Sequence, residues 1–356
     1  MIRFASMQEL LDKLTTSLAA RARKYDLSGD WPAESLRCFG ELGGWSWGVP
    51  KQYGGAGMPA VQRMRIYGAL ARGCMNSALY ITQHESALDL ICMSGNEELK
   101  SRVLPRYARG EGLTTIGYAQ LTTSHQGGEP VFRAKLEGNC IVLEGFMPWV
   151  TGAGKVETVA AGAVLPNGEQ VVVLLPFDAP GVEVKPPMKL LALDASHTSA
   201  VHCHGVRLPI TELVAGPLPQ VLAQRSPIRR LSVSATGLGL MAGMEDCIAD
   251  LEGSGPSGLP RYGEELHQLR AALADRLETL AAEENAEKEE IDTLRADLNA
   301  LLVRLAGVLM TVAKGSGYLR DRTAQRLARE ALFFCVWSAQ DPVRQGTIDR
   351  LLGKQG

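Results

Sequence analysis

The sequence predicts an α+β protein made of an N-terminal helical domain, a central β-barrel-like domain and a C-terminal four-helix bundle. The spacing of apolar residues is the first reason, because it changes from a helical period to short strand-like runs after Leu113 and changes back at Pro227. Chain length is the second reason, because 356 residues exceed what one typical hydrophobic core organises. We expect the domains to span residues 1–116, 117–220 and 221–356.

Helical spacing marks both ends of the chain. Leu10, Leu14 and Leu18 recur at helical intervals and predict a first helix with one apolar face. Further helical periods lie at residues 61–73, 77–93, 229–252, 261–284, 286–313 and 322–337. A run of charges at residues 283–292 predicts a solvent-exposed helix end or turn between two of these helices.

Short runs rich in β-branched residues predict the strands of the middle domain. They lie at residues 114–121, 130–136, 140–143, 158–165, 170–175, 181–185 and 200–206. Pro166, Asn167 and Gly168 separate two of these runs, and turn residues in that position predict a tight β-hairpin.

Composition and charge exclude several classes of protein. Apolar residues make up 46% and charged residues 21% of the chain, which is typical of a soluble globular protein. A formal net charge of -2 gives no basis for binding nucleic acid. The seven cysteines form no CxxC pair. The first residues of the chain lack the long apolar core of a signal peptide, and no 18-residue apolar run predicts a membrane span. We therefore expect a cytoplasmic protein with free thiols and no nucleic-acid, metal or membrane partner.

The segment at residues 145–153 is the most informative part of the predicted β domain. It places Trp149, Val150 and Thr151 in succession and follows them with small residues. A flat aromatic ligand could use such a segment, because Trp offers a ring face, Val a wall, and the Thr hydroxyl and backbone N–H groups hydrogen bonds. An ordinary buried Trp on a strand is the alternative interpretation of the same residues.

Motifs at both ends of this segment resemble those of the acyl-CoA dehydrogenase superfamily. In chain order they are Gly48-Val49-Pro50 followed by Tyr53-Gly54-Gly55, Tyr118-Ala119-Gln120-Leu121-Thr122, Trp149-Val150-Thr151, Leu208-Pro209, Gly239-Leu240-Met241, Gly315-Ser316-Gly317-Tyr318, and Arg326-Leu327-Ala328-Arg329-Glu330-Ala331. The resemblance covers about residues 30 to 340. It implies an acyl-CoA dehydrogenase-like fold, with FAD bound between the β domain and the C-terminal helices.

The resemblance also implies which residues hold the flavin. Backbone groups of Leu121 and Thr122 and the hydroxyls of Thr122 and Thr151 would bond the flavin edge, while Trp149 and Val150 would pack against it. Gly127 and Gly128 occupy the loop where the family has Gly-Ser-Asp, so a close backbone approach to the pyrophosphate remains but one hydroxyl donor is lost.

The glutamate that removes the substrate's α-proton in this family has no counterpart in the sequence. Alignment on the family pattern puts Ser338 at the usual position of this base and Arg229 at its alternative position. Neither side chain is a ready base near neutral pH. Asp341 is the nearest carboxylate to Ser338, and its alternative role is a helix cap or turn before Pro342.

A second departure concerns retention of the cofactor. The family carries Arg-x-x-Phe-Gly-x-Pro at the start of a C-terminal helix, and its Arg reaches the FAD of a neighbouring subunit. Residues 252–262 contain no such motif, and Arg261 could replace that Arg only electrostatically. This departure predicts weakened FAD binding.

Three functions are compatible with these residues. The first is an FAD-dependent oxidoreductase of acyl-CoA dehydrogenase type, acting on a small-molecule acyl thioester such as an acyl-CoA. The second is a flavin monooxygenase or oxidase of the same fold, in which His84 would move a proton, although a hydrogen-bonded structural His is the alternative. The third is a non-catalytic homologue that acts in binding or assembly. The apolar stripe at residues 297–313, together with the family habit, predicts a homodimer or homotetramer.

Overall fold

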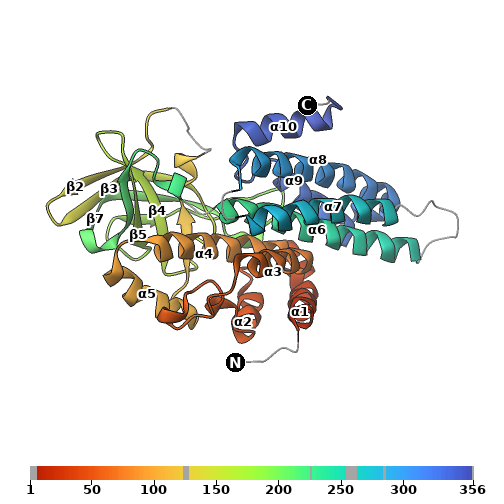
Figure 1. Cartoon of the computed structure of the whole chain (residues 1–356), viewed down its shortest axis with the longest axis horizontal. Coiled ribbons are helices and arrows are strands. Elements are labelled where there is room, and N and C mark those ends of the chain that lie inside the picture. The colour runs from red at the N-terminus through yellow and green to blue at the C-terminus, as the bar shows by residue number, and fades with distance from the viewer. Residues whose placement is uncertain (1–5, 123–127, 225–226, 254–262, 284–285, 355–356) are drawn as a thin grey trace.

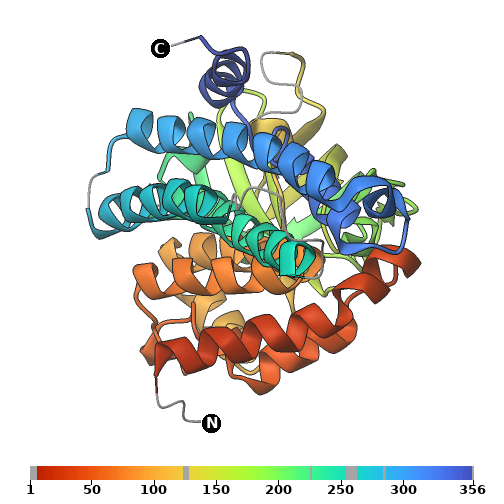
Figure 2. The same cartoon turned by 90° about the vertical axis from the view of Figure 1, so that its right-hand side faces the viewer.

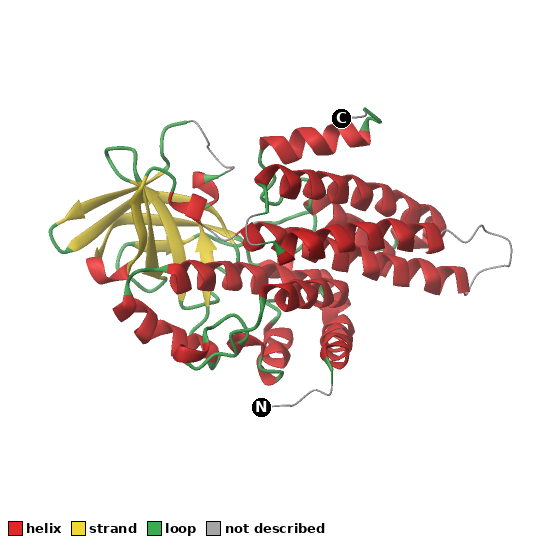
Figure 3. Ribbon diagram, viewed as in Figure 1, coloured by secondary structure: helices red, strands yellow, loops and turns green. Residues whose placement is uncertain are grey.

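The three predicted parts follow one another in the structure, a computed structural model that describes residues 6–122, 128–224, 227–253, 263–283 and 286–354. Helices from the two ends of the chain pack together, and the strands gather at one end of the molecule (Figure 1). The predicted fold class is therefore confirmed. Colouring by secondary structure separates the sheet from the helices that border it (Figure 3).

Five helices form the N-terminal part. They are α1 (Met7–Ser28), α2 (Ala33–Glu41), α3 (Ala60–Gly73), α4 (Met75–Met93) and α5 (Glu97–Ala108). The helix α1 begins where the Ser6 side chain accepts a hydrogen bond from the Glu9 N–H, and its leucine stripe, including Leu10 and Leu14, is buried as predicted. The helix α4 is buried along most of its length, so it forms the centre of this part.

The strands form one eight-stranded mixed sheet in the order β6-β7-β3-β2-β4-β5-β8, with β1 parallel to β4. Their bounds are β1 (Thr114–Gly117), β2 (Phe132–Glu137), β3 (Cys140–Val150), β4 (Thr158–Val164), β5 (Gln170–Pro176), β6 (Val182–Val184), β7 (Ser199–Pro209) and β8 (Leu213–Leu218). The hairpin predicted at Asn167 and Gly168 joins β4 to β5, with Gly168 at a positive φ of 86°. The strand β8 was not predicted, because Gly216 and Pro217 interrupt its apolar pattern.

The sheet buries both of its faces near β4 and β5. Val159, Val171 and Val173 contribute to a core shared with β2, β3 and β7. Ala160 and Val172 point the other way, into a second core that α4 and α5 cover. This two-sided burial explains why both strands are nearly continuous runs of apolar residues.

The C-terminal part contains α6 (Pro227–Gly253), α7 (Gly263–Ala282), α8 (Lys288–Ala313), α9 (Thr323–Phe333) and α10 (Asp341–Leu351). The first four lie side by side as the predicted bundle (Figure 1). The helix α10 was not predicted, and it packs along α8 through only two buried residues, Val343 and Thr347. So few buried positions give too weak an apolar period for a sequence-based prediction.

Single-turn 3-10 helices connect these elements: η1 (Gly44–Ser46), η2 (Lys51–Tyr53), η3 (Ala119–Leu121), η4 (Asp194–Ser196), η5 (Ile210–Glu212), η6 (Val221–Gln224) and η7 (Lys314–Tyr318). In the turned view the blue α8 lies above the blue-green helices α6 and α7, and the orange and red N-terminal helices lie below (Figure 2). The helices α3 and α6 meet through glycines, because the Cβ position of Gly239 is occupied by the backbone of Gly68. This close crossing joins the N-terminal part to the bundle.

One helical segment, Lys288–Tyr318, is long and apolar enough to cross a membrane by length and composition. No stretch long enough to span a membrane was expected from the sequence. Half of its most apolar window is buried inside the fold, where α8 packs against α6, α9 and α10. Core helices of water-soluble proteins pass the same test, so this segment is weak evidence for a membrane.

Candidate active site

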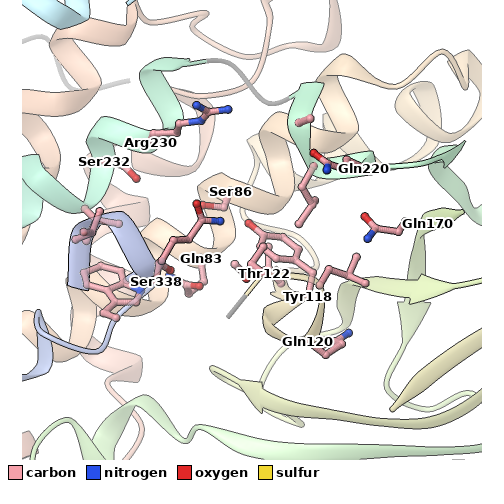
Figure 4. A pocket seen from close by; sticks show the side chains of 18 of the residues that line it. Gln83, Ser86, Tyr118, Gln120, Thr122, Gln170, Gln220, Arg230, Ser232 and Ser338 are labelled. Atoms are coloured by element: carbon pink, nitrogen blue, oxygen red, sulfur yellow. The ribbon is translucent and has the colours of Figure 1, made fainter. Parts of the chain in front are cut away.

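A cavity of about 690 Å³ lies where the three parts of the fold meet. Side chains from α4, from the β1–η3 segment, from α6 and α8, and from the segment between α9 and α10 line it. In the close view, Gln83 and Ser86 lie between Arg230 and Ser232 on one side and Tyr118 and Thr122 on the other (Figure 4). Ser338 reaches the same cavity from the α9–α10 connection.

Many of the lining side chains can form hydrogen bonds. Five of them are glutamines: Gln83, Gln120, Gln170, Gln220 and Gln340. The Gln120 Nε2 donates to the backbone oxygens of Gly117 (3.1 Å) and Gly162 (2.6 Å), which leaves its buried Oε1 without a partner in the described part of the chain. A buried acceptor of this kind favours a ligand with a hydrogen-bond donor.

The segment from Phe334 to Ser338 is held in place by a guanidinium. The Arg295 Nη2 donates to the Phe334 oxygen at 3.0 Å and to the Trp337 oxygen at 3.2 Å. Ser338 follows with a positive φ of 49°, a conformation that few residues other than glycine adopt. The structure places Ser338 among the residues that line the cavity. Its hydroxyl is not a base at neutral pH.

Part of the predicted flavin-binding set lines this cavity. Leu121 and Thr122 are on its wall, where the Thr122 hydroxyl donates to the Ala119 oxygen at 3.2 Å. That bond uses the hydroxyl proton and leaves the oxygen able to accept. Gly128 also lines the cavity, whereas Gly127 lies outside the described residues.

The other part of that set, Trp149, Val150 and Thr151, is not among the cavity-lining residues. The Trp149 side chain is on the surface with 49% exposure, and Val150 is buried within the sheet core. The Thr151 hydroxyl lies 3.2 Å from the Thr198 hydroxyl. The interpretation of Trp149 as an ordinary buried residue is wrong, since it presents a large aromatic face to the outside.

His84 is not brought to the cavity wall. It lies in the core beside Trp45, Tyr80 and Tyr107, and its Nδ1 is 3.1 Å from the Thr114 oxygen. Burial lowers the pKa of His84 to about 4, so the ring is neutral near pH 7. This environment matches a structural histidine better than one that exchanges protons with a ligand.

Asp341 is not among the cavity-lining residues either, although its neighbour Gln340 is. It is the first residue of α10, its side chain is exposed, and its carboxylate accepts a hydrogen bond of 2.8 Å from Arg344. Of the alternatives to a catalytic role, the helix cap falls to Gln340, and Asp341 lies in the first turn of α10, directly before Pro342. The other aligned positions stay untested, because the Arg229 side chain and all of Arg261 are outside what the structure describes.

Two residues that the sequence analysis did not select, Asp292 and Arg295, line the cavity from α8. The expectation that residues 283–292 are simply solvent-exposed is wrong at its end, where Ile291 is buried and Asp292 half-buried. Arg295 shares a helix stripe with Ile291 and Leu298, both in the core. The sequence could have indicated Arg295 as a site residue, because a charged residue on an apolar helix stripe becomes buried when the stripe packs.

The charged residues of the cavity are mainly cationic. Arg230, Lys288 and Arg295 line it, and Asp292 is the one carboxylate among the described lining residues. The Lys288 Nζ is 3.7 Å from the Asp292 carboxylate. Burial raises the pKa of Asp292, while Lys288 and Arg230 act in the opposite direction. The described residues contain no cluster of three or more His, Cys, Asp or Glu side chains that could hold a metal ion.

Comparison with known proteins supports the resemblance seen in the motifs. Residues 6–111 match the family model of the acyl-CoA dehydrogenase N-terminal domain. A probable acyl-CoA dehydrogenase, YngJ of Bacillus subtilis, is 22% identical over 358 residues, which cover 95% of this chain and 94% of the relative. The chain therefore carries a match to the acyl-CoA dehydrogenase N-terminal domain and is similar to acyl-CoA dehydrogenases along nearly its whole length.

Solved structures of the superfamily share the whole fold. Butyryl-CoA dehydrogenase from Megasphaera elsdenii has a TM-score of 0.85, at 17% identity and 99% coverage of both chains. Glutaryl-CoA dehydrogenase from Mycobacterium smegmatis, in complex with FADH2, has a TM-score of 0.80 at 21% identity, with 99% of this chain and 96% of that chain covered. At these identities the superposition establishes the fold and leaves activity to be argued from the site.

Proposed function

We propose that this protein is a flavin-dependent oxidoreductase that binds FAD and acts on an acyl thioester, the substrate of an acyl-CoA dehydrogenase. The main supporting observation is that Leu121, Thr122 and Ser338 all line the same cavity of about 690 Å³. These are the positions at which the superfamily pattern has the flavin and the catalytic base. Relatives and fold neighbours named as acyl-CoA dehydrogenases support the same activity.

The residues present fit a flavin along one wall of the cavity. The Gln120 Oε1, which has no hydrogen-bond partner among the described residues, and the Thr122 oxygen offer acceptors to a ring with polar edges. We propose that Gly128 approaches the phosphates and that the segment Trp149, Val150 and Thr151, at the end of β3 and directly after it, forms the outer border of this site. FAD, when bound, supplies the acceptor for the hydride equivalent that leaves the substrate.

This function requires a residue that takes the substrate's α-proton, and Ser338 cannot act as that base. We propose Asp292 for this role. It is the one carboxylate on the described cavity wall, and burial raises its pKa, which makes a carboxylate a stronger base. Lys288, 3.7 Å away, would keep part of the charge balanced.

Two measurements test this function. Addition of FAD to the purified protein should produce a bound-flavin absorbance spectrum. Anaerobic mixing with a series of acyl-CoAs should then bleach that spectrum, and Asp292→Asn should slow bleaching about 10²–10⁴-fold. Glu290→Gln is the matched control, because Glu290 is an exposed carboxylate on the same helix that does not line the cavity. A loaded protein that no acyl-CoA bleaches would contradict the proposal.

An oxygen-dependent monooxygenase or oxidase is the second candidate, favoured by the lack of a carboxylate on the Ser338 segment. Such chemistry needs no α-proton base at that place. The burial of His84 removes the residue first considered for it. Oxygen consumption on addition of reduced flavin, without bleaching by acyl-CoA under anaerobic conditions, would favour this candidate. A protein that stays colourless with excess FAD would instead favour a non-catalytic binding or assembly protein.

We also propose a homodimer or homotetramer. The helix α8 carries the partly exposed apolar residues Leu301, Val303, Val308 and Val312, and Trp149 is half exposed. Burying such residues between copies would remove apolar surface from water. The domain limits 1–116, 117–220 and 221–356 and a cytoplasmic location remain proposals, and the free state of all seven cysteines suits a reducing compartment.

A further inference from the structure

Arg295 is a buried cation whose positive charge the described residues do not balance. Its side chain is only 6% exposed, and it lies on the cavity wall. Its Nη2 donates to two backbone oxygens, of Phe334 and Trp337, and its Cζ lies 5.1 Å from the centre of the Phe334 ring. Its Nη1 is buried and has no hydrogen-bond partner in the described part of the chain.

The neighbouring acid does not neutralise Arg295. Asp292 is one turn earlier on α8 and lies beside Lys288 instead. No ion pair joins Arg295 to any described carboxylate, and burial lowers its pKa to about 9, with Cys335 as the one opposing influence. An unpaired buried guanidinium is costly unless an anion meets it, and its planar fork favours carboxylate and phosphate oxygens.

The position of Arg295 points to the reacting end of the ligand. Its Nη2 lies 3.2 Å from the Trp337 oxygen, and the next residue is Ser338, where the superfamily pattern places the catalytic base. Phosphate groups of an acyl-CoA are far from its acyl carbons, so an anion beside Ser338 belongs with the acyl group. Gln83, Ser86 and Ser232 also line the cavity, so a polar acyl group suits this lining better than a long alkyl chain does.

We propose that Arg295 binds a carboxylate carried by the acyl group, so that the substrate is the thioester of a short dicarboxylic acid. This inference rests on the proposed function and narrows its substrate class. Nη1 would donate to one carboxylate oxygen, while Nη2 continues to hold the Ser338 segment. Arg230 and Lys288, also on the cavity wall, remain available for other anionic parts of the ligand.

Equilibrium binding to the FAD-loaded protein tests the proposal without requiring turnover. The probes are two matched pairs, succinyl-CoA with butyryl-CoA and glutaryl-CoA with valeryl-CoA, which differ in a terminal carboxylate. We expect the carboxylated member of at least one pair to bind on the order of 10- to 100-fold more tightly, the range of a charge-assisted hydrogen bond. Arg295→Gln should remove this preference, and Arg295→Lys should keep part of it.

Arg304→Gln is the matched control, because Arg304 is an exposed arginine of α8 that bonds a single backbone oxygen, that of Arg350. It should leave the preference unchanged. Thermal unfolding of each variant identifies loss of fold, and Arg295→Lys covers the case in which Arg295→Gln does not fold. Free glutarate and inorganic phosphate, tested as stabilisers against thermal unfolding, distinguish a carboxylate site from a phosphate site.

Several outcomes would overturn the inference. Equal binding of both members in each pair would do so, as would a preference that survives in Arg295→Gln. Stabilisation by phosphate and not by glutarate, lost in Arg295→Gln, would assign the site to a phosphate instead. Bleaching by butyryl-CoA without any preference for carboxylated thioesters would overturn this inference and leave the proposed function standing. Failure of the loaded protein to bind any thioester would overturn both.

Discussion

Replacement of Gly239 by alanine should separate the two helices that join the N-terminal part to the bundle. An alanine Cβ at this position would lie 2.6 Å from the Gly68 carbonyl carbon and 2.7 Å from its Cα, and closer still to its oxygen. Real Cβ contacts are essentially never under 3.0 Å, and the atoms in the way belong to the backbone, so α3 or α6 has to move.

The size of the effect follows from two opposing terms. Alanine favours a helix over glycine by about 1 kcal/mol. Overpacking costs about 1–3 kcal/mol, and a shift of ~1 Å between helices forfeits part of the dispersion energy along the whole crossing. We therefore expect Gly239→Ala to be less stable than an unhindered Gly→Ala change by about 2 kcal/mol or more.

Urea denaturation of three variants measures this difference. Gly307→Ala on α8 is the unhindered control, because nothing lies within 4 Å of its added Cβ. Gly68→Ala probes the other side of the same crossing, where the added Cβ meets the Ala235 oxygen at an ordinary 3.5 Å. The free energy of unfolding should rise for Gly307→Ala, change little for Gly68→Ala and fall for Gly239→Ala. Equal stability of Gly239→Ala and Gly307→Ala would refute the packing argument.

Three further predictions concern the site and its surroundings. The buried His84 takes up a proton near pH 4 when folded and near its ordinary pKa of 6.5 when unfolded, so its contribution of about 3 kcal/mol to stability is complete above pH 6.5 and lost as the pH falls to 4. Urea titrations across this range should show a shallower pH dependence for His84→Asn, and an identical one would contradict the shift. Trp149→Ala and Thr151→Ala should each raise the dissociation constant for FAD, and unchanged flavin titrations in both would remove β3 from the site. Ser338→Glu should increase the rate of anaerobic flavin reduction by an acyl-CoA, by up to about 10²–10⁴-fold, and no increase would show that this position does not face the α-carbon.

Local features of the fold could be predicted because short-range physics controls them. Turn residues at Asn167 and Gly168 define the β4–β5 hairpin whatever surrounds it. The leucine stripe of α1 requires one buried face, and the structure provides it. The α10 helix could not be predicted, because only Val343 and Thr347 are buried in it and its stability comes from packing on α8.

The candidate site, like the fold, could be predicted only in part from the sequence. Leu121, Thr122 and Ser338 were found through motif order and line the cavity, whereas Trp149, Val150 and Thr151 were found in the same way and do not. His84 was selected for its chemistry on a helix that resembles one near the family's flavin, and Asp341 as the carboxylate nearest Ser338. The structure places His84 in the aromatic core and Asp341 on the surface. A sequence states which group a residue carries, whereas burial by distant segments decides whether that group reaches a ligand.

The sequence by itself determined the order of helices, strands and helices and the resemblance to acyl-CoA dehydrogenases, because these depend on residue types and their spacing. The assignment of Ser338 to the position of the missing glutamate stays a prediction from the motif alignment. Only the tertiary structure brought Asp292 and Arg295 of α8 to the cavity that β1, α4 and α6 also line. The physical reason is that a helix presents charges all around its axis, and which of them become buried depends on neighbours contributed by remote parts of the chain. Arg295 could be identified as a candidate anion-binding residue only from the tertiary structure, which buries it without an anionic partner among the described residues.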